Sequence, residues 1–179
     1  NFSNKYLLIK KSANYGLLTS EFKTYLPCEY QQITALDKGY LMLVKNGKYG
    51  IMTDNGKTVL KCEFDSISTT NDNILMKQNG KWGTINTKGA IPCKYTEIVP
   101  VRNFYAVKDG KKWGIVGAAG NTILAPTYKL DKVEAFGNFF KVSYKKHFGL
   151  LDGTGKLVLP IAYEEITKRD GSSFFVKQK

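Results

Sequence analysis

The sequence predicts an all-β fold made of five tandem repeats. A pair consisting of an aromatic residue and a glycine recurs along the chain, at Tyr15-Gly16, Tyr49-Gly50, Trp82-Gly83, Trp113-Gly114 and Phe148-Gly149. The five glycines lie 34, 33, 31 and 35 residues apart. A nearly constant period of this length indicates a repeat architecture. No segment shows a sustained apolar period of 3.6 residues, so we expect strands and turns rather than helices.

Each repeat is predicted to contain three short strands. The first is an alternating stretch, such as residues 40–44, and it leads into a tight hairpin turn. Asn-Gly and Asp-Gly favour type I′ hairpin turns because their backbones tolerate positive φ angles. These dipeptides are Asn46-Gly47, Asn79-Gly80 and Asp109-Gly110.

The second and third strands of each repeat are separated by another glycine turn, at Gly56, Gly89, Gly120 and Gly155. The second strand carries the aromatic-glycine pair, whose glycine is expected to allow close backbone approach. The third ends in a proline or cysteine two residues before an aromatic residue. Acidic residues that follow it, namely Asp65, Glu97 and Glu165, are interpreted as turn or capping residues that accept backbone N–H groups.

The repeats form a single predicted domain over residues 1–179. Its units are approximately residues 5–33, 40–67, 74–98, 104–133 and 139–166, with a final strand at 174–177. Because the chain begins and ends on the same type of strand, we expect an open twisting array; a closed propeller-like or barrel-like ring is the alternative. The chain opens at Asn1 rather than Met, so we expect a processed or excised piece of a longer polypeptide.

The three cysteines do not have the spacing of a metal or redox motif. Cys28, Cys62 and Cys93 each stand two residues before an aromatic residue, in a position that holds Pro126 and Ile161 in the later repeats. A position that accepts Cys, Pro and Ile is predicted to be a small apolar core position.

This pattern resembles the WG-repeat family, also called KWG repeats. The resemblance rests on Asn-Gly-Lys followed by Trp-Gly or Tyr-Gly, on the second glycine turn, on the apolar-Pro-x-x-Tyr element and on the acidic-x-Ile tail that follows it. It covers nearly the whole chain. It implies a bacterial repeat module, often associated with the cell envelope or surface, and it carries no catalytic residues. The first and fifth units depart from the pattern, as capping units do.

Composition narrows the function further. The chain has 179 residues, a formal net charge of +12, 42% apolar residues and no run of 18 apolar residues, so a membrane-spanning helix is not expected. Only Arg102 and Arg169 are arginines. Because phosphate and base recognition favours the guanidinium group, nucleic acid is an unlikely partner. With one histidine, His147, and no nucleotide-binding or hydrolase motif, we expect neither an enzyme nor a metal or cofactor site.

Two sets of residues are candidates for a binding surface. Lys48, Lys81 and Lys112 precede the repeated aromatic residues and are predicted to form a basic stripe on an outward strand face. The aromatic residues Tyr49, Trp82, Trp113 and Phe148 are interpreted as a core ladder. An exposed groove in which these rings stack on sugars is the alternative.

We therefore expect a non-enzymatic interaction or scaffold module of a bacterial envelope or surface assembly. The expected partner is another protein of that assembly. The alternative function is binding of glycan or peptidoglycan through exposed aromatic residues. The expected location is the periplasm or cell surface, with the cytoplasm left open.

Overall fold

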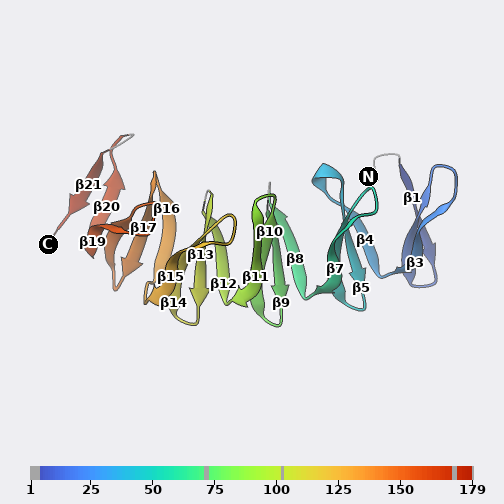
Figure 1. The fold of residues 1–179 in the computed structure, drawn as a ribbon, viewed down its shortest axis with the longest axis horizontal. Coiled ribbons are helices and arrows are strands. Elements are labelled where there is room, and N and C mark those ends of the chain that lie inside the picture. Colours follow the sequence, from blue (N-terminus) through green and yellow to red (C-terminus); the bar gives the residue numbers. More distant parts are fainter. Residues whose placement is uncertain (1–4, 71–72, 102, 171–172, 179) are drawn as a thin grey trace. The chain divides into compact units, whose positions relative to one another are not determined.

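The computed structural model describes residues 5–70, 73–101, 103–170 and 173–178, and these residues form six small antiparallel sheets in chain order (Figure 1). The predicted all-β repeat fold is confirmed, and none of the described sheets closes into a barrel. One 3-10 turn, Asp37–Gly39, interrupts the strands. No helix in this part of the chain is long and apolar enough to cross a membrane.

The six sheets are numbered here from the N-terminus. Sheet 1 has three strands in the order β1 (Tyr6–Lys11), β2 (Asn14–Thr19), β3 (Thr24–Tyr30). Sheet 2 has the order β4 (Gln32–Ala35), β5 (Tyr40–Lys45), β6 (Lys48–Thr53), β7 (Thr58–Phe64). Sheet 3 has the order β8 (Ser66–Thr70), β9 (Asn73–Gln78), β10 (Lys81–Asn86), β11 (Gly89–Tyr95).

The later sheets follow the same plan. Sheet 4 has the order β12 (Glu97–Val101), β13 (Phe104–Asp109), β14 (Lys112–Gly117), β15 (Thr122–Tyr128). Sheet 5 has the order β16 (Lys132–Phe136), β17 (Phe139–Tyr144), β18 (His147–Leu151), β19 (Leu157–Tyr163). Sheet 6 contains β20 (Glu165–Lys168) and β21 (Phe174–Lys177).

The prediction of three strands in each unit is wrong for sheets 2 to 5, which have four strands each. The extra strand is the acidic-x-Ile tail of the preceding repeat, whose acidic residues were expected to lie in turns. Ile98 and Ile166 of these tail strands are 8% and 0% exposed. The second residue of β4, β12, β16 and β20 is buried and the first is exposed, as expected for a strand that buries one face. Each sheet therefore combines three strands of one repeat with the tail of the repeat before it.

A recurring backbone hydrogen bond positions each tail strand. The residue just before or near its start donates its N–H to a carbonyl in the second strand of the sheet that the tail joins. The donor and acceptor pairs are Gln31 to Val44 (2.7 Å), Asp65 to Lys77 (2.8 Å), Thr96 to Lys108 (2.8 Å), Asp131 to Ser143 (2.7 Å) and Glu164 to Lys177 (2.9 Å).

The chain divides into two compact units, each with its own core. The first comprises Asn1–Thr70 and Ile74–Gly80, and the second comprises Asn71–Asn73 and Lys81–Lys179. The core of the first unit lies between sheets 1 and 2 and contains Leu17, Leu26, Ile33, Leu41, Leu43 and Met52. The core of the second unit lies between sheets 4 and 5 and includes Ala106, Trp113, Ile115, Val133, Phe140 and Val142.

The glycine of each aromatic-glycine pair is required by close backbone approach, as predicted. A Cβ atom placed on Gly114 would lie 2.5 Å from the carbonyl oxygen of Leu124 and 2.7 Å from the nitrogen of Pro126. The strand register shifts at this point, between Trp113 and Ile115. Gly16, Gly50 and Gly83 have the same relation to the third strand of their own repeats. These three glycines face Cys28, Cys62 and Cys93, which are half-buried.

We expect Gly114→Ala to destabilise the protein. The added methyl group has no room against the backbone of β15, and overpacking of this kind costs about 1–3 kcal/mol of unfolding free energy. Gly153→Ala is the matched control, because nothing lies within 4 Å of a Cβ atom built there. Chemical denaturation of both variants measures the difference. Equal stability of the two would show that the close approach is not a constraint.

Candidate interaction surface

The hairpin turns between the second and third strands of sheets 2 to 5 lie at the same end of each sheet as the connection to the next sheet. We call this the hairpin edge. Its turns are Asn46-Gly47, Asn79-Gly80, Gly110-Lys111 and Lys145-Lys146. The predicted type I′ geometry is present at Asn46-Gly47, with φ angles of 53° and 69°, and at Asn79-Gly80, with 51° and 75°. In sheet 4 the turn is shifted by one residue from the predicted Asp109-Gly110, because Asp109 pairs with Lys112.

In each of sheets 1 to 5 the repeated aromatic residue occupies the same cross-strand position near the hairpin edge. In sheets 1, 3 and 4 the aromatic residue is paired with an aromatic residue of the third strand of its repeat, as in Trp82 with Tyr95. In sheets 2 and 5 the same pairing joins Tyr49 to Phe64 and Phe148 to Tyr163.

The burial of these aromatic residues differs along the chain. Trp113 is 4% exposed and belongs to the core of the second unit, against which Tyr144 and Ile161 also pack. Tyr49, Trp82 and Phe148 are half-buried. The arrangement places Trp113 in a sheet–sheet core, where its ring is not available for stacking on a sugar.

The three predicted stripe lysines each begin the third strand of their sheet, beside a hairpin turn. The Nζ of Lys48 lies 2.5 Å from Oδ1 of Asp65. Lys81 is half-buried and Lys112 is exposed. Lys48 belongs to the first unit, whereas Lys81 and Lys112 belong to the second, so a continuous stripe through all three stays a prediction.

Asp65 caps the next hairpin turn, as the sequence predicted. The hydrogen bond from Lys48 and those from the backbone N–H groups of Gly80 and Asn79 hold the pKa of its carboxyl below the usual value. Asp131 has a similar position and accepts the N–H of Lys145 at 2.7 Å. The capping prediction was wrong in detail for Glu97 and Glu165, which lie within tail strands. Thr96 and Glu164 are the residues equivalent to Asp65, because each donates the same backbone hydrogen bond just before a tail strand. Glu97 and Glu165 therefore lie one residue later in the repeat than Asp65.

Sequence reasoning missed a second group of lysines that contact the repeated aromatic residues. The Nζ of Lys108 lies 5.2 Å from the ring centre of Trp113 and 3.5 Å from Oε2 of Glu97. Lys10 lies 5.3 Å from the ring of Tyr15 in the same way. The sequence could have shown this contact, because a two-residue hairpin turn places each of these lysines directly opposite the aromatic residue of the next strand. They serve packing as well as charge.

The tip lysines of the second unit were also missed. Lys111, Lys112, Lys129, Lys145 and Lys146 are all exposed, and the connection from sheet 4 to sheet 5 contains Lys129. Lys145 and Lys146 adopt φ angles of 48° and 65°. A left-handed conformation costs residues with a Cβ atom roughly 1–2 kcal/mol each, which is why Asn-Gly is favoured in the equivalent turns.

Other chemistry is sparse in the part of the chain that the structure describes. No group of three or more His, Cys, Asp or Glu residues is placed to hold a metal ion there. His147 is exposed, and its Nδ1 lies 3.0 Å from the carbonyl oxygen of Lys145. A hollow of about 210 Å³ in the first unit is lined by residues that include Tyr30, Lys45 and Cys62. It is smaller than ordinary ligand pockets of roughly 300–1,000 Å³, and burial raises the pKa of the Cys62 thiol, which disfavours the reactive thiolate.

Fold and surface together define a tandem β-repeat protein in which each of sheets 2 to 5 ends in the same kind of hairpin turn. Residues 15–49, 49–82, 82–113 and 148–168 match the family described as "WG containing repeat". Since these segments cover more than half of the chain, the protein belongs to this family, which confirms the resemblance found in the sequence. A comparison with curated proteins gave no match.

Solved structures show only distant similarity. Hsv2 from Kluyveromyces lactis is 11% identical, with a TM-score of 0.40 over 88% of this chain and 59% of that chain. PorZ, described as a bacterial surface component of the type-IX secretion system of Porphyromonas gingivalis, is 8% identical, with a TM-score of 0.36 over 96% of this chain and 28% of that chain. The N-terminal domain of Nup159 is 9% identical, with a TM-score of 0.40 over 83% of this chain and 52% of that chain. At these TM-scores the similarities carry no argument about function, and this chain spans about three fifths of the length of Hsv2.

We expect Asp65→Asn to lower stability at neutral pH. A carboxyl whose pKa is depressed in the folded state binds its proton more readily when unfolded, so its contribution is present above the ordinary pKa of 3.8. That contribution is lost as the pH falls through the depressed folded value. The difference between wild type and D65N, measured by urea unfolding from pH 7 down to pH 2.5, should therefore shrink toward zero at the acid end.

Glu63→Gln is the control, because the Glu63 side chain is exposed on the neighbouring strand β7. A D65N difference that stays constant with pH would contradict the capping role of Asp65.

Proposed function

We propose that this protein is a non-enzymatic module that binds another protein within a bacterial envelope or surface assembly. The observation that carries the proposal is the hairpin edge: sheets 2, 4 and 5 repeat one buried framework while their exposed turns differ. Stacked repeats of this kind provide extended surfaces that suit a large partner.

Sheets 2, 4 and 5 share the same buried framework. Leu41, Tyr105 and Phe140 occupy equivalent positions in the second strand of sheets 2, 4 and 5, and they are 3%, 2% and 3% exposed. The turns above them are Asn-Gly, Gly-Lys and Lys-Lys. Because the core does not depend on the turn residues, the turns are free to serve recognition.

Binding of glycan or peptidoglycan is the alternative function. It requires exposed flat rings, and the burial of Trp113 against sheet 5 removes one of the two tryptophans from such a surface. Nucleic acid is a weaker candidate still, because lysine outnumbers arginine so strongly in this sequence. The protein partner is therefore the function that we favour, with the envelope or cell surface as its proposed location.

The test is affinity capture with the 179-residue chain from envelope and cytosolic fractions of the source organism, at low and high salt. We expect one protein to be retained in stoichiometric amount at high salt, and hydrogen exchange of the isolated complex to protect residues at the hairpin edge. Recovery of nucleic acid or polysaccharide alone, released by salt, would contradict the proposal. So would protection confined to the opposite end of the strands.

A further inference from the structure

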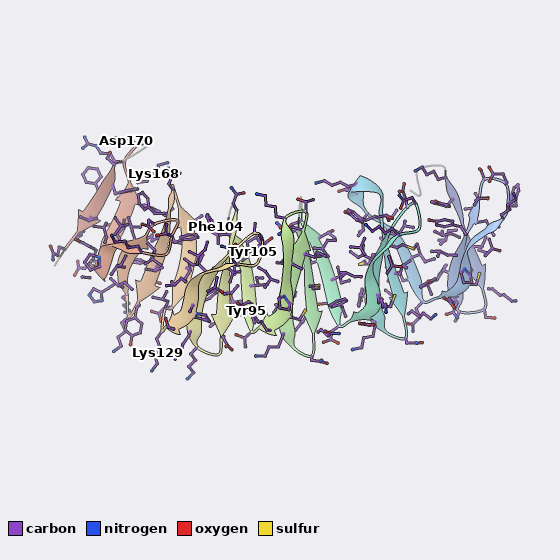
Figure 2. All side chains as sticks on the ribbon, viewed as in Figure 1. Tyr95, Phe104, Tyr105, Lys129, Lys168 and Asp170 are labelled. Atoms are coloured by element: carbon purple, nitrogen blue, oxygen red, sulfur yellow. The ribbon has the colours of Figure 1, made fainter. Side chains whose placement is uncertain are left out.

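The hairpin edge of the second unit concentrates positive charge at the tips of two neighbouring sheets. Lys111 and Lys112 stand at the tip of sheet 4, and Lys145 and Lys146 form the tip of sheet 5. Lys129 lies on the connection between these sheets (Figure 2). These five exposed residues are called the lysine tip. Sheets 4 and 5 share one core, which keeps their two tips adjacent.

Hydrogen bonds to Asp131 hold the backbone of the lysine tip in place. The carboxylate of Asp131 accepts the N–H of Lys145 at 2.7 Å, and Asp131 itself donates its N–H to the carbonyl of Ser143. The Nζ of Lys145 lies 5.3 Å from the ring centre of Tyr144. The acidic side chains in the tips and on the connection between them are Asp131, whose Oδ2 faces the turn backbone, and the exposed Asp109. At the same end of these sheets, carboxylate oxygens of Glu97 and Glu164 lie 3.5 Å from the Nζ of Lys108 and 3.9 Å from the Nζ of Lys177, so both already have lysine partners outside the tip. The five ammonium groups thus outnumber the carboxylates.

Lys145-Lys146 is also an unfavourable choice for its turn. Both residues adopt left-handed φ angles, at a position where sheets 2 and 3 have Asn-Gly. The turn would form more readily with Asn-Gly, so its stability does not explain the two lysines. Strain of this kind at an exposed site is a reason to look for a binding role.

We infer that the lysine tip binds an acidic polypeptide segment, rich in Asp and Glu, of the protein partner; this inference rests on the proposed function. Within this chain, lysine already holds carboxylates at the edges of sheets, as in Lys48 with Asp65 and Lys45 with Glu29. An ammonium group is a hydrated point charge that pairs with single carboxylates, whereas phosphate is favoured by the guanidinium fork that the lysine tip lacks. Packed sheets lie about 10 Å apart, which an extended peptide spans in about three residues.

The experiment measures binding of a fluorescent deca-glutamate peptide to the 179-residue chain by anisotropy, at 50 and 150 mM salt. The test variant is Lys145→Asn with Lys146→Gly. It removes two positive charges and gives sheet 5 the Asn-Gly turn that sheets 2 and 3 have. We expect the variant to fold, with a Tm at or above that of wild type. We expect its dissociation constant for the peptide to be at least about fivefold higher than that of wild type.

The matched control is Lys88→Asn with Lys168→Asn. It removes the same charge from exposed positions of the second unit at the other end of the strands, where Figure 2 shows Lys168. We expect the control to change the dissociation constant less than twofold. Equal weakening by both variants would overturn the inference, because net charge alone would then explain binding.

Two further outcomes would also overturn the inference. One is that polyphosphate, or an anionic polysaccharide of equal charge, binds at least tenfold tighter than the peptide and loses that affinity in the test variant. The other is that the test variant still captures the protein partner as wild type does. That second result would leave the proposed function intact and reject only this site. If the wild-type chain itself captured no protein partner, the proposed function would be rejected.

Discussion

Each sheet of this protein after the first begins with a strand that belongs, in sequence, to the repeat before it. The hydrogen bond from the connecting residue to the second strand, as from Asp131 to Ser143 at 2.7 Å, sets the register of that strand. The tail strand then buries an apolar residue such as Val133 in the core of the sheet that it joins. Neighbouring repeats are therefore linked by backbone pairing as well as by packing. A repeat that lost its tail would leave the next sheet one strand short.

The two residues of the aromatic-glycine pair have different structural roles. The glycine lets the third strand of the repeat approach within contact of the backbone, and the aromatic ring beside it fills space near the sheet–sheet core. Trp113 shows the full form of this arrangement, with Lys108 over its ring and Glu97 beyond. Both residues of the pair therefore serve the framework of the sheet.

The many lysines consequently have different roles, which net charge does not reveal. Lys108 lies against a buried ring and Lys48 pairs with the carboxylate that caps the next turn. Lys145 and Lys146 occupy a turn in which both backbones are left-handed, and the Nζ of Lys145 lies 5.3 Å from the ring centre of Tyr144. The role of each lysine therefore follows from its contacts and not from the net charge of +12.

Sequence alone was sufficient for the all-β class, the repeat period, the family and the type I′ turns, because glycine spacing and Asn-Gly dipeptides act through local backbone geometry. It also predicted the capping role of Asp65. It missed the fourth strand, because a tail such as residues 97–101 is too short to show where its hydrogen bonds go. It also left the burial of Trp113 open, since that depends on sheet 5 packing against sheet 4. Long-range pairing and burial are properties of segments brought together from different repeats, and only the tertiary structure decides them.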